Sequence, residues 1–408
     1  MEATMLKKLI LPLILFLIFT HNVLAKERGE TLVDGLYSSL LSEQRELLIH
    51  LPNTYHLSET SRYPVLYLTD GLRNFNHASG TLDLLNQSYE AQEMIIVAIK
   101  NTHRTRDFTP TYDESYNQWG ISGGADNFLD FIEKELIPHI NKRYRSNGFK
   151  VLSGHSLGGL LSIYALQTRP HLFQAHFAFS PSLWWHKSAV LKDTQRFLNQ
   201  STPLNNFLYM NLADEGGDML RAYEEYGQLL NSYKRSGFTF HQEFIKQENH
   251  STSAMVGQNR AYVELNNMLS CTADDTSKGL TGIEQCYQKL AKQFAVNITP
   301  DYAAYRQAAD TAIQDKRYFD AINIYEQLIK QYPYITDAYF RLAYLYEGTG
   351  EDTKALQTLD KALKVSLTEN VENNKIKTFR AHVMAKLPEQ NCETAKIYVE
   401  NGKTKCPL

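Results

Sequence analysis

The chain has 408 residues, with 42 lysines and arginines against 45 aspartates and glutamates, so its formal net charge is only −3. No run of five or more like charges occurs, which excludes the electrostatic signature of a protein that binds nucleic acid or an anionic membrane. The length exceeds that of most single domains, so the sequence predicts one large domain and one smaller one.

Residues 1–25 predict a secretory signal peptide. Two lysines precede an apolar run from Leu9 to Thr20, and Val23-Leu24-Ala25 resembles a cleavage site. The run is shorter than the roughly 20 residues that a membrane-spanning helix needs, and no cysteine follows it as in a lipoprotein. We therefore expect a mature chain that begins near Lys26 and is periplasmic or secreted; the alternative is an uncleaved anchor.

Residues 45–245 alternate short, β-branched apolar runs with amphipathic stretches. The strand-like runs are RELLIHL, PVLYLTD, MIIVAIK, FKVLSG, QAHFAFS, NFLYMNLA and FTFHQEFI, and the helix-like stretches are FLDFIEKELIPHINKRY and LGGLLSIYALQ. Alternation of this kind predicts βαβ units with a mostly parallel sheet. We place this α/β domain at residues 26–295.

A candidate nucleophile lies where one of these strands meets a helix. Gly154-His155-Ser156-Leu157-Gly158 matches G-x-S-x-G, with FKVLS before it and LGGLLSIYALQ after it. The glycines are needed because such a serine has a strained backbone, and side chains at their positions would collide with neighbouring elements. The pattern predicts that Ser156 is exposed at the carboxyl edge of the sheet as a nucleophile. The alternative is an ordinary serine in a tight turn.

A serine hydroxyl needs a base, and after a turn of this kind the chain order is serine, acid, histidine. His250 lies in the loop QENHSTSA after the last strand-like run, whereas His241 lies inside that run and is expected on a strand face. The acid should follow NFLYMNLA, where Asp214, Glu215 and Asp218 compete. Asp214 directly follows the strand and Asp218 stands at a natural N-cap position, so Glu215 is preferred.

Several motifs resemble the putative esterase family of α/β hydrolases. These are VLYLTDGLRNF, NTHRTRDFTPTY, GHSLGG, FSPSLWW and ENHSTS, which occur in this order between about Leu41 and Met268. The family includes enterochelin and other siderophore esterases, feruloyl esterases, S-formylglutathione hydrolases and mycolyltransferases. The resemblance implies an α/β-hydrolase fold and an ester substrate, but it does not identify the ester.

The resemblance also implies an oxyanion hole. In similar enzymes, the backbone amide after the Asp-Gly pair that follows the third strand and the amide after the nucleophile bind the developing charge. These amides belong to Leu72 and Leu157 here; the alternative for Asp70-Gly71 is an ordinary turn. Similar esterases often carry a glutamate soon after the strand that precedes the acid, which favours Glu215, and some relatives lack a well-placed acid.

Other side chains have both a structural and a functional interpretation. Trp184 and Trp185 belong either to the core or to a pocket wall. In the loop NTHRTRDFTPTY, Arg104, Arg106 and Asp107 form either a paired ion network or a substrate-positioning group. Four histidines precede every candidate acid and are expected to be structural or pocket-lining: His155, His171, His176 and His186.

Beyond residue 295 the sequence is rich in alanine, tyrosine and leucine at helical spacing. RYFDAINIYEQLIKQYP and EDTKALQTLDKALKVSL align with Ala321 over Ala355 and Tyr325 over Leu359, 34 residues apart. This period is typical of tetratricopeptide helix pairs, so we expect a small all-α domain at residues 296–408. It is either a docking surface for a protein partner or a stabilising appendage.

The four cysteines all follow residue 270, and an even number in an exported chain favours disulfides. Cys271–Cys286 and Cys392–Cys406 are the simplest of three connectivities, and the spacings do not fit a zinc site.

Together these features predict an exported serine esterase that acts through Ser156, His250 and Glu215, requires no metal or organic cofactor and cleaves a siderophore-type or other small ester. The alternatives are an acyltransferase that uses the same residues and a non-catalytic binding protein that works through the helical domain.

Overall fold

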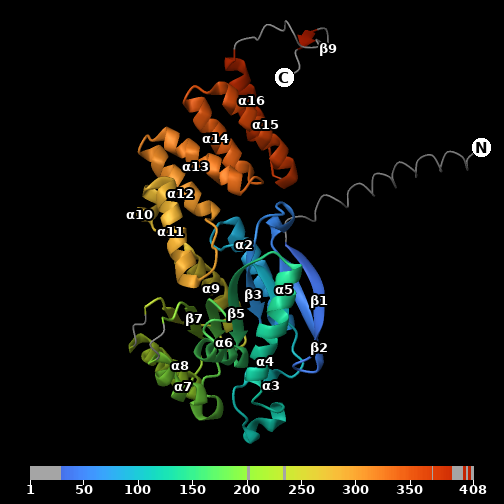
Figure 1. The fold of residues 1–408 in the computed structure, drawn as a ribbon, viewed down its shortest axis with the longest axis vertical. Helices are drawn as coiled ribbons and strands as arrows, with labels where there is room; N and C mark the ends of the chain where they lie inside the picture. Colours follow the sequence, from blue (N-terminus) through green and yellow to red (C-terminus); the bar gives the residue numbers. More distant parts are fainter. Residues whose placement is uncertain are drawn as a thin grey trace, which may run out of the picture. The chain divides into compact units, whose positions relative to one another are not determined.

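The computed structural model describes residues 29–199, 203–232, 236–369, 371–387, 398–400 and 403–405, so the predicted signal peptide lies outside the described residues. The chain forms two units (Figure 1). The first extends to Thr272 and also includes Glu284–Asp301, whereas the second contains Ala273–Ile283 and the chain from Tyr302 onward. One of the three divisions along the chain, between Ile283 and Glu284, falls within the helix α11(Gly279–Phe294).

An eight-stranded sheet forms the centre of the first unit, in the order β1-β2-β4-β3-β5-β6-β7-β8. Its strands are β1(Glu30–Ser38), β2(Glu43–Leu51), β3(Tyr63–Leu68), β4(Ile95–Ile99), β5(Ser146–His155), β6(Ala175–Phe179), β7(Phe207–Leu212) and β8(Thr239–Phe244). Strands β3 to β8 are parallel, whereas β1 and β2 pair antiparallel at one edge. Each predicted strand-like run corresponds to one of these strands, so the predicted α/β fold with a mostly parallel sheet is confirmed.

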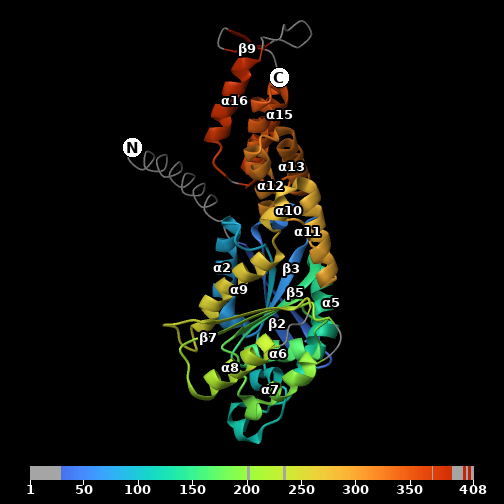
Figure 2. The same ribbon diagram turned by 90° about the vertical axis from the view of Figure 1, so that its left-hand side faces the viewer.

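Helices cover both faces of this sheet, with α2 and α9 on one face and α6 and α8 on the other (Figure 2). The helices are α2(Gly71–Gln87), α3(Arg104–Phe108), α4(Ala125–Phe131), α5(Ile137–Arg143), α6(Leu157–Thr168), α7(Trp185–Leu198), α8(Gly217–Ser232) and α9(Ser253–Leu269). Short helical turns lie at η1(Asn53–His56), η2(Glu114–Trp119) and the π-helical η3(Ile132–Leu136). Parallel strands covered on both faces explain why the strand sequences are almost continuously apolar.

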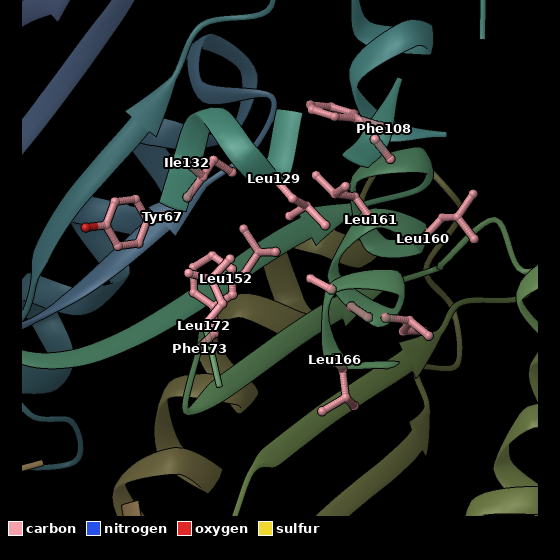
Figure 3. Close-up of a cluster of buried hydrophobic side chains, with 14 of the residues drawn as sticks. Tyr67, Phe108, Leu129, Ile132, Leu152, Leu160, Leu161, Leu166, Leu172 and Phe173 are labelled. Carbon is pink, nitrogen blue, oxygen red and sulfur yellow. The ribbon is translucent and has the colours of Figure 1, made fainter. Parts of the chain in front are cut away.

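Helix α6 is apolar on nearly all sides because it is buried between the sheet and neighbouring helices. Figure 3 shows Leu160, Leu161 and Leu166 of α6 in one buried cluster with Leu152 of β5 and Leu129 of α4. All five side chains are fully buried. The packing therefore holds both the strand and the helix that flank Ser156.

Cys271 and Cys286 form a disulfide with their Cα atoms 5.8 Å apart, which confirms one of the two predicted pairs. Closing a loop of about 15 residues stabilises a folded chain by roughly 3 kcal/mol in the chain-entropy description. The other predicted pair, Cys392 and Cys406, lies outside the described residues.

The second unit is helical, as the 34-residue period predicts. It contains α10(Ala273–Ser277), α12(Tyr302–Gln314), α13(Tyr318–Gln331), α14(Thr336–Gly348), α15(Asp352–Glu369), α16(Asn374–Lys386) and the short antiparallel pair β9(Tyr398–Glu400) and β10(Lys403–Lys405). The aligned positions Ala321, Tyr325, Ala355 and Leu359 are all fully buried, so equivalent residues of the two repeats form the core of this unit. Among the described residues, none of the helices combines the length and the apolar character needed to cross a membrane.

Candidate active site

Ser156 lies in the sharp turn between β5 and α6, with φ 60° and ψ −116°. This conformation is rare for a residue with a side chain and is typical of functional turns. Both flanking glycines are required by contact: a Cβ at Gly154 would lie 2.1 Å from the carbonyl oxygen of Gly158, and one at Gly158 would lie 2.4 Å from Thr69 Oγ1. The backbone N–H of Ser156 donates to the carbonyl of Phe179 at 2.9 Å, which ties the turn to β6.

The serine, the histidine and the glutamate that the sequence selects lie in one hydrogen-bonded chain. His250 Nε2 lies 3.0 Å from Ser156 Oγ, and His250 Nδ1 lies 2.6 Å from Glu215 Oε2. A carboxylate only accepts, so Nδ1 carries the proton and Nε2 is free to accept from the serine hydroxyl. The Glu215 side chain is 11% exposed and that of His250 is 42% exposed, so the imidazole is open to solvent and the carboxylate is largely shielded from it.

Of the three carboxylates that competed for the acid position, Glu215 is the one that contacts His250. Asp214 accepts from the backbone N–H of Gln247 at 2.7 Å. Helix α8 begins at Gly217, so Asp218 lies inside the first turn and does not act as the expected N-cap. Its exposed side chain pairs instead with Arg221 at 2.8 Å.

Glu215 remains ionised because of its hydrogen bonds. Burial raises the pKa of its carboxyl group, but the hydrogen bonds from His250 and Ser180 outweigh this effect and hold the pKa below its usual range. The carboxylate is therefore charged at neutral pH and can stabilise a positive charge on His250.

Ser180 is a member of this network that the sequence did not single out. It follows β6 directly, is fully buried and has a φ of 39°. Its hydroxyl donates to Glu215 Oε1, the oxygen that His250 does not use. The backbone N–H of Ser180 donates to both the main-chain and side-chain oxygens of Asn211 at 3.0 and 3.2 Å, which fixes the strained turn.

We expect Ser180→Ala to lower kcat about tenfold, because a hydrogen bond to a charged group is lost. Loss of one donor raises the pKa of Glu215, so activity should begin to fall at a higher pH than in the unmodified protein as the solution is acidified. The pH profile of kcat measures both effects. Ser253→Ala is the matched control: its hydroxyl contacts that of Ser180 at 2.9 Å without reaching Glu215, so its effect on the acidic limb should be smaller. An unchanged profile in Ser180→Ala would contradict this role.

His155 contacts both the backbone and the ring of His250. Burial lowers its pKa to about 4, so the ring is neutral at neutral pH. Its Nε2 lies 2.5 Å from the backbone carbonyl of His250, which only accepts, so Nε2 carries the proton. The two rings also pack with their centroids 4.6 Å apart. His155 thus has a structural contact, one of the two roles expected for it.

The other candidate histidines lie elsewhere in the first unit. His241 lies on β8, and its ring stacks on that of Tyr209 on the neighbouring strand β7, as expected for a strand-face side chain. His176 is fully buried, with Nδ1 2.9 Å from the carbonyl of Ser162. His171 pairs with Glu133 at 3.1 Å. These contacts are structural.

The two amides implied for the oxyanion hole belong to the first turns of helices α2 and α6. Amides in a first turn have no acceptor within the helix and are free for an anion. The N-cap of α2 is Asp70, which is in the left-handed conformation, and Leu72 is the second residue of the helix. Leu157 is the first residue of α6 and follows Ser156. The Leu72 side chain is exposed and points to solvent, so its contribution at this site would be its backbone amide.

A cavity of about 860 Å³ opens over Ser156 and His250. Tyr116, Trp119 and Trp184 line it, and the centroid of the Tyr116 ring lies 5.1 Å from that of Trp119 and 5.6 Å from that of Trp184. Trp185, by contrast, is buried, and its Nε1 donates to Thr111 Oγ1 at 3.2 Å. The adjacent tryptophans therefore have different roles, one in the cavity wall and one in the core.

The aromatic residues Tyr116 and Trp119 were not anticipated, because they come from a turn whose sequence carries no strand or helix signal. Ser182 also lines the cavity, with its hydroxyl 3.2 Å from Ser156 Oγ. Within the described ranges, no group of three or more histidine, cysteine, aspartate or glutamate side chains is arranged to hold a metal ion.

The sheet order, the strained serine turn and the position of the cavity define the first unit as an α/β hydrolase. Residues 38–217 match the family model described as "Putative esterase", and residues 312–367 match that of a tetratricopeptide repeat. The α/β region is therefore similar to the putative esterase family, as its motifs predicted, and the helical region is similar to tetratricopeptide repeats.

Three similar proteins carry related names. The ferri-bacillibactin esterase BesA of Bacillus subtilis is 33% identical over 169 residues, which are 37% of this chain and 58% of that protein. The siderophore triacetylfusarinine C esterase of Aspergillus fumigatus is 37% identical over 145 residues, 33% of this chain and 49% of that protein. The chain thus spans about half the length of these relatives. An IroE-like serine hydrolase from Shewanella oneidensis is 29% identical, with a TM-score of 0.65 over 74% of this chain and 100% of that chain.

Proposed function

We propose that this protein is an exported serine esterase that hydrolyses a carboxylic ester through an acyl-enzyme on Ser156. The single observation that carries the proposal is the hydrogen-bonded chain from Ser156 Oγ through His250 to Glu215, in a cavity large enough for a ligand.

In the proposed first step, His250 Nε2 takes the proton of the Ser156 hydroxyl while its oxygen attacks the ester carbonyl. Glu215 holds the proton on Nδ1 and stabilises the imidazolium that forms. The amides of Leu72 and Leu157 bind the oxyanion of the tetrahedral intermediate. The C–O bond to the alcohol then breaks, and His250 Nε2–H gives its proton to the departing oxygen.

In the second step, His250 Nε2 takes a proton from water while the water oxygen attacks the carbonyl carbon of the acyl-enzyme. Collapse of the second tetrahedral intermediate releases the acid, and the proton returns from His250 to Ser156 Oγ. No metal or organic cofactor is needed for either step.

A siderophore-type ester is the substrate class that we propose. One relative is named as a siderophore esterase and another as a ferri-bacillibactin esterase. Aromatic side chains line the cavity, which suits an acyl group with an aromatic ring. Export is supported by the signal-like N-terminus and by the Cys271–Cys286 disulfide, because disulfides persist in oxidising compartments. The tetratricopeptide helices are proposed as a surface for a protein partner.

The experiment is a panel of catecholate trilactones, feruloyl sugars and short-chain nitrophenyl esters, with products followed by liquid chromatography and mass spectrometry. We expect the catecholate trilactone to be opened to its linear acid and to have the highest kcat/KM. Transfer of the acyl group to an added alcohol in place of water would indicate an acyltransferase. Failure to turn over any member of the panel would contradict the esterase proposal.

A further inference from the structure

Arg104, at the start of α3, bridges two backbone segments beside the candidate nucleophile. Its Nε and Nη2 atoms donate to the two carboxylate oxygens of Asp70 at 2.7 and 2.9 Å. Nη2 also donates to the carbonyl of His155 at 3.3 Å. Only the planar guanidinium fork can make this bidentate contact and reach a third oxygen at the same time.

The first of the two segments begins at Asp70. This residue is 5% exposed, has φ 53° and ψ 43°, and caps α2 two residues before Leu72. A left-handed conformation costs about 1 kcal/mol or more for a residue with a side chain, so the surroundings must hold it in place. Asn101 donates to the same carboxylate at 2.5 Å, which leaves Asp70 clamped from two sides.

The second segment is the nucleophile turn. His155, whose carbonyl Arg104 contacts, lies directly before Ser156 and two residues before Leu157. The two segments are also in contact with each other. Gly158, next to Leu157, packs against Thr69, next to Asp70, so closely that a Cβ at Gly158 would lie 2.4 Å from Thr69 Oγ1. Arg104 therefore joins the two turns that carry the amides implied for the oxyanion hole.

We propose that Arg104 is a positioning residue that holds these two turns at the separation the oxyanion needs. The inference rests on the proposed function, because it assigns the residue a part in the same reaction. Oxyanion donors act only when they are already aimed at the developing charge, and small displacements of such groups are costly. Arg104 also lines the cavity, but its positive charge is neutralised by the ion pair with Asp70 and is therefore less able to attract an anionic substrate.

The test compares Arg104→Lys and Asp70→Asn with Arg106→Lys in the full chain. Lysine keeps the charge, but its donors lie on one nitrogen, so it cannot reproduce the contacts of Nε and Nη2 to Asp70 and His155. Asp70→Asn weakens the same ion pair from the carboxylate side, so the two variants should have the same effect. Arg106 is the matched control because it lies on the same helix and pairs with Glu43 and Asp107. All variants are assayed with neutral para-nitrophenyl butyrate and with anionic para-nitrophenyl hemiglutarate.

We expect Arg104→Lys and Asp70→Asn to lower kcat about 100-fold for both esters, with KM nearly unchanged. Binding of phenylboronic acid, which forms a tetrahedral anion on a nucleophilic serine, should weaken in parallel. Arg106→Lys should keep the original kcat. If Arg104 had only a structural role, the variants would have a lower melting temperature but would not show a lower kcat at an unchanged KM.

Two results would overturn the inference. A loss confined to the anionic ester would make Arg104 a substrate-binding residue, and full kcat in both variants would remove its role altogether. Labelling by a fluorophosphonate separates this failure from that of the proposed function. If Ser156 is labelled while the variants keep full kcat, the inference alone fails; if Ser156 is not labelled in the unmodified protein, the serine mechanism fails and the inference with it.

Discussion

Ser156→Ala should abolish hydrolysis of every ester that the protein cleaves, with kcat lower by about 10⁴-fold or more. Its hydroxyl is the atom that would attack the ester, and it contacts His250 and Ser182 at the floor of the cavity. Because these contacts lie at the cavity surface and not in the packed core, the melting temperature should hardly change. Steady-state kinetics and thermal unfolding of the purified variant measure the two effects.

Ser162→Ala is the matched control for this substitution. Ser162 lies on the same helix, is fully buried and donates to the carbonyl of Leu152 at 3.2 Å, away from the cavity. Its loss should destabilise the fold by about 1 kcal/mol and leave kcat unchanged. If Ser156→Ala retained more than a trace of activity in a clean preparation, the nucleophile would have to be another residue.

Glu215→Gln should lower turnover by about 100-fold or more with little change in stability. A neutral amide cannot stabilise the imidazolium that forms on His250, and an amide NH₂ group facing Nδ1 would favour the wrong tautomer. The hydrogen bond from Ser180 can be kept by the glutamine oxygen, so the geometry should survive. The ratio of kcat values for the variant and the unmodified protein, measured at neutral pH, provides the test.

Asp218→Asn is the control for the loss of a neighbouring carboxylate. Asp218 pairs with Arg221 on the surface, an interaction of small energy, so this variant should be nearly normal in activity and stability. If Asp218→Asn lost most of its activity while Glu215→Gln remained normal, Asp218 and not Glu215 would be the acid that acts on His250. If neither change mattered, His250 and Ser156 would act as a dyad without an acid.

The fold could be read from the sequence because its strands are continuous apolar runs separated by clear breaks. Buried parallel strands such as β5 and β7 need apolar residues on both faces, and this requirement leaves a strong pattern. Strand β1 was missed because it is an edge strand whose Val33 is 81% exposed, so its sequence ETLVDGLYS has no such pattern.

Within the candidate site, the sequence identified residues that carry a local motif and missed those defined by tertiary contact. Ser156 and His250 could be selected from a turn motif and from chain order. Ser180 could not, because its partner Glu215 lies 35 residues away and its own turn is held by Asn211. The N-cap expected for Asp218 was wrong by two positions, because the helix begins at Gly217, and helix boundaries depend on backbone geometry that short motifs do not specify.

The central claim, that Ser156 is an activated nucleophile, is tested most directly by reaction of the purified protein with a fluorophosphonate, followed by peptide mass mapping. We expect a single adduct on Ser156 and much slower labelling in a His250→Ala variant, because the hydroxyl then has no base. An adduct on a different residue, or no adduct on a folded protein, would show that Ser156 is not the nucleophile.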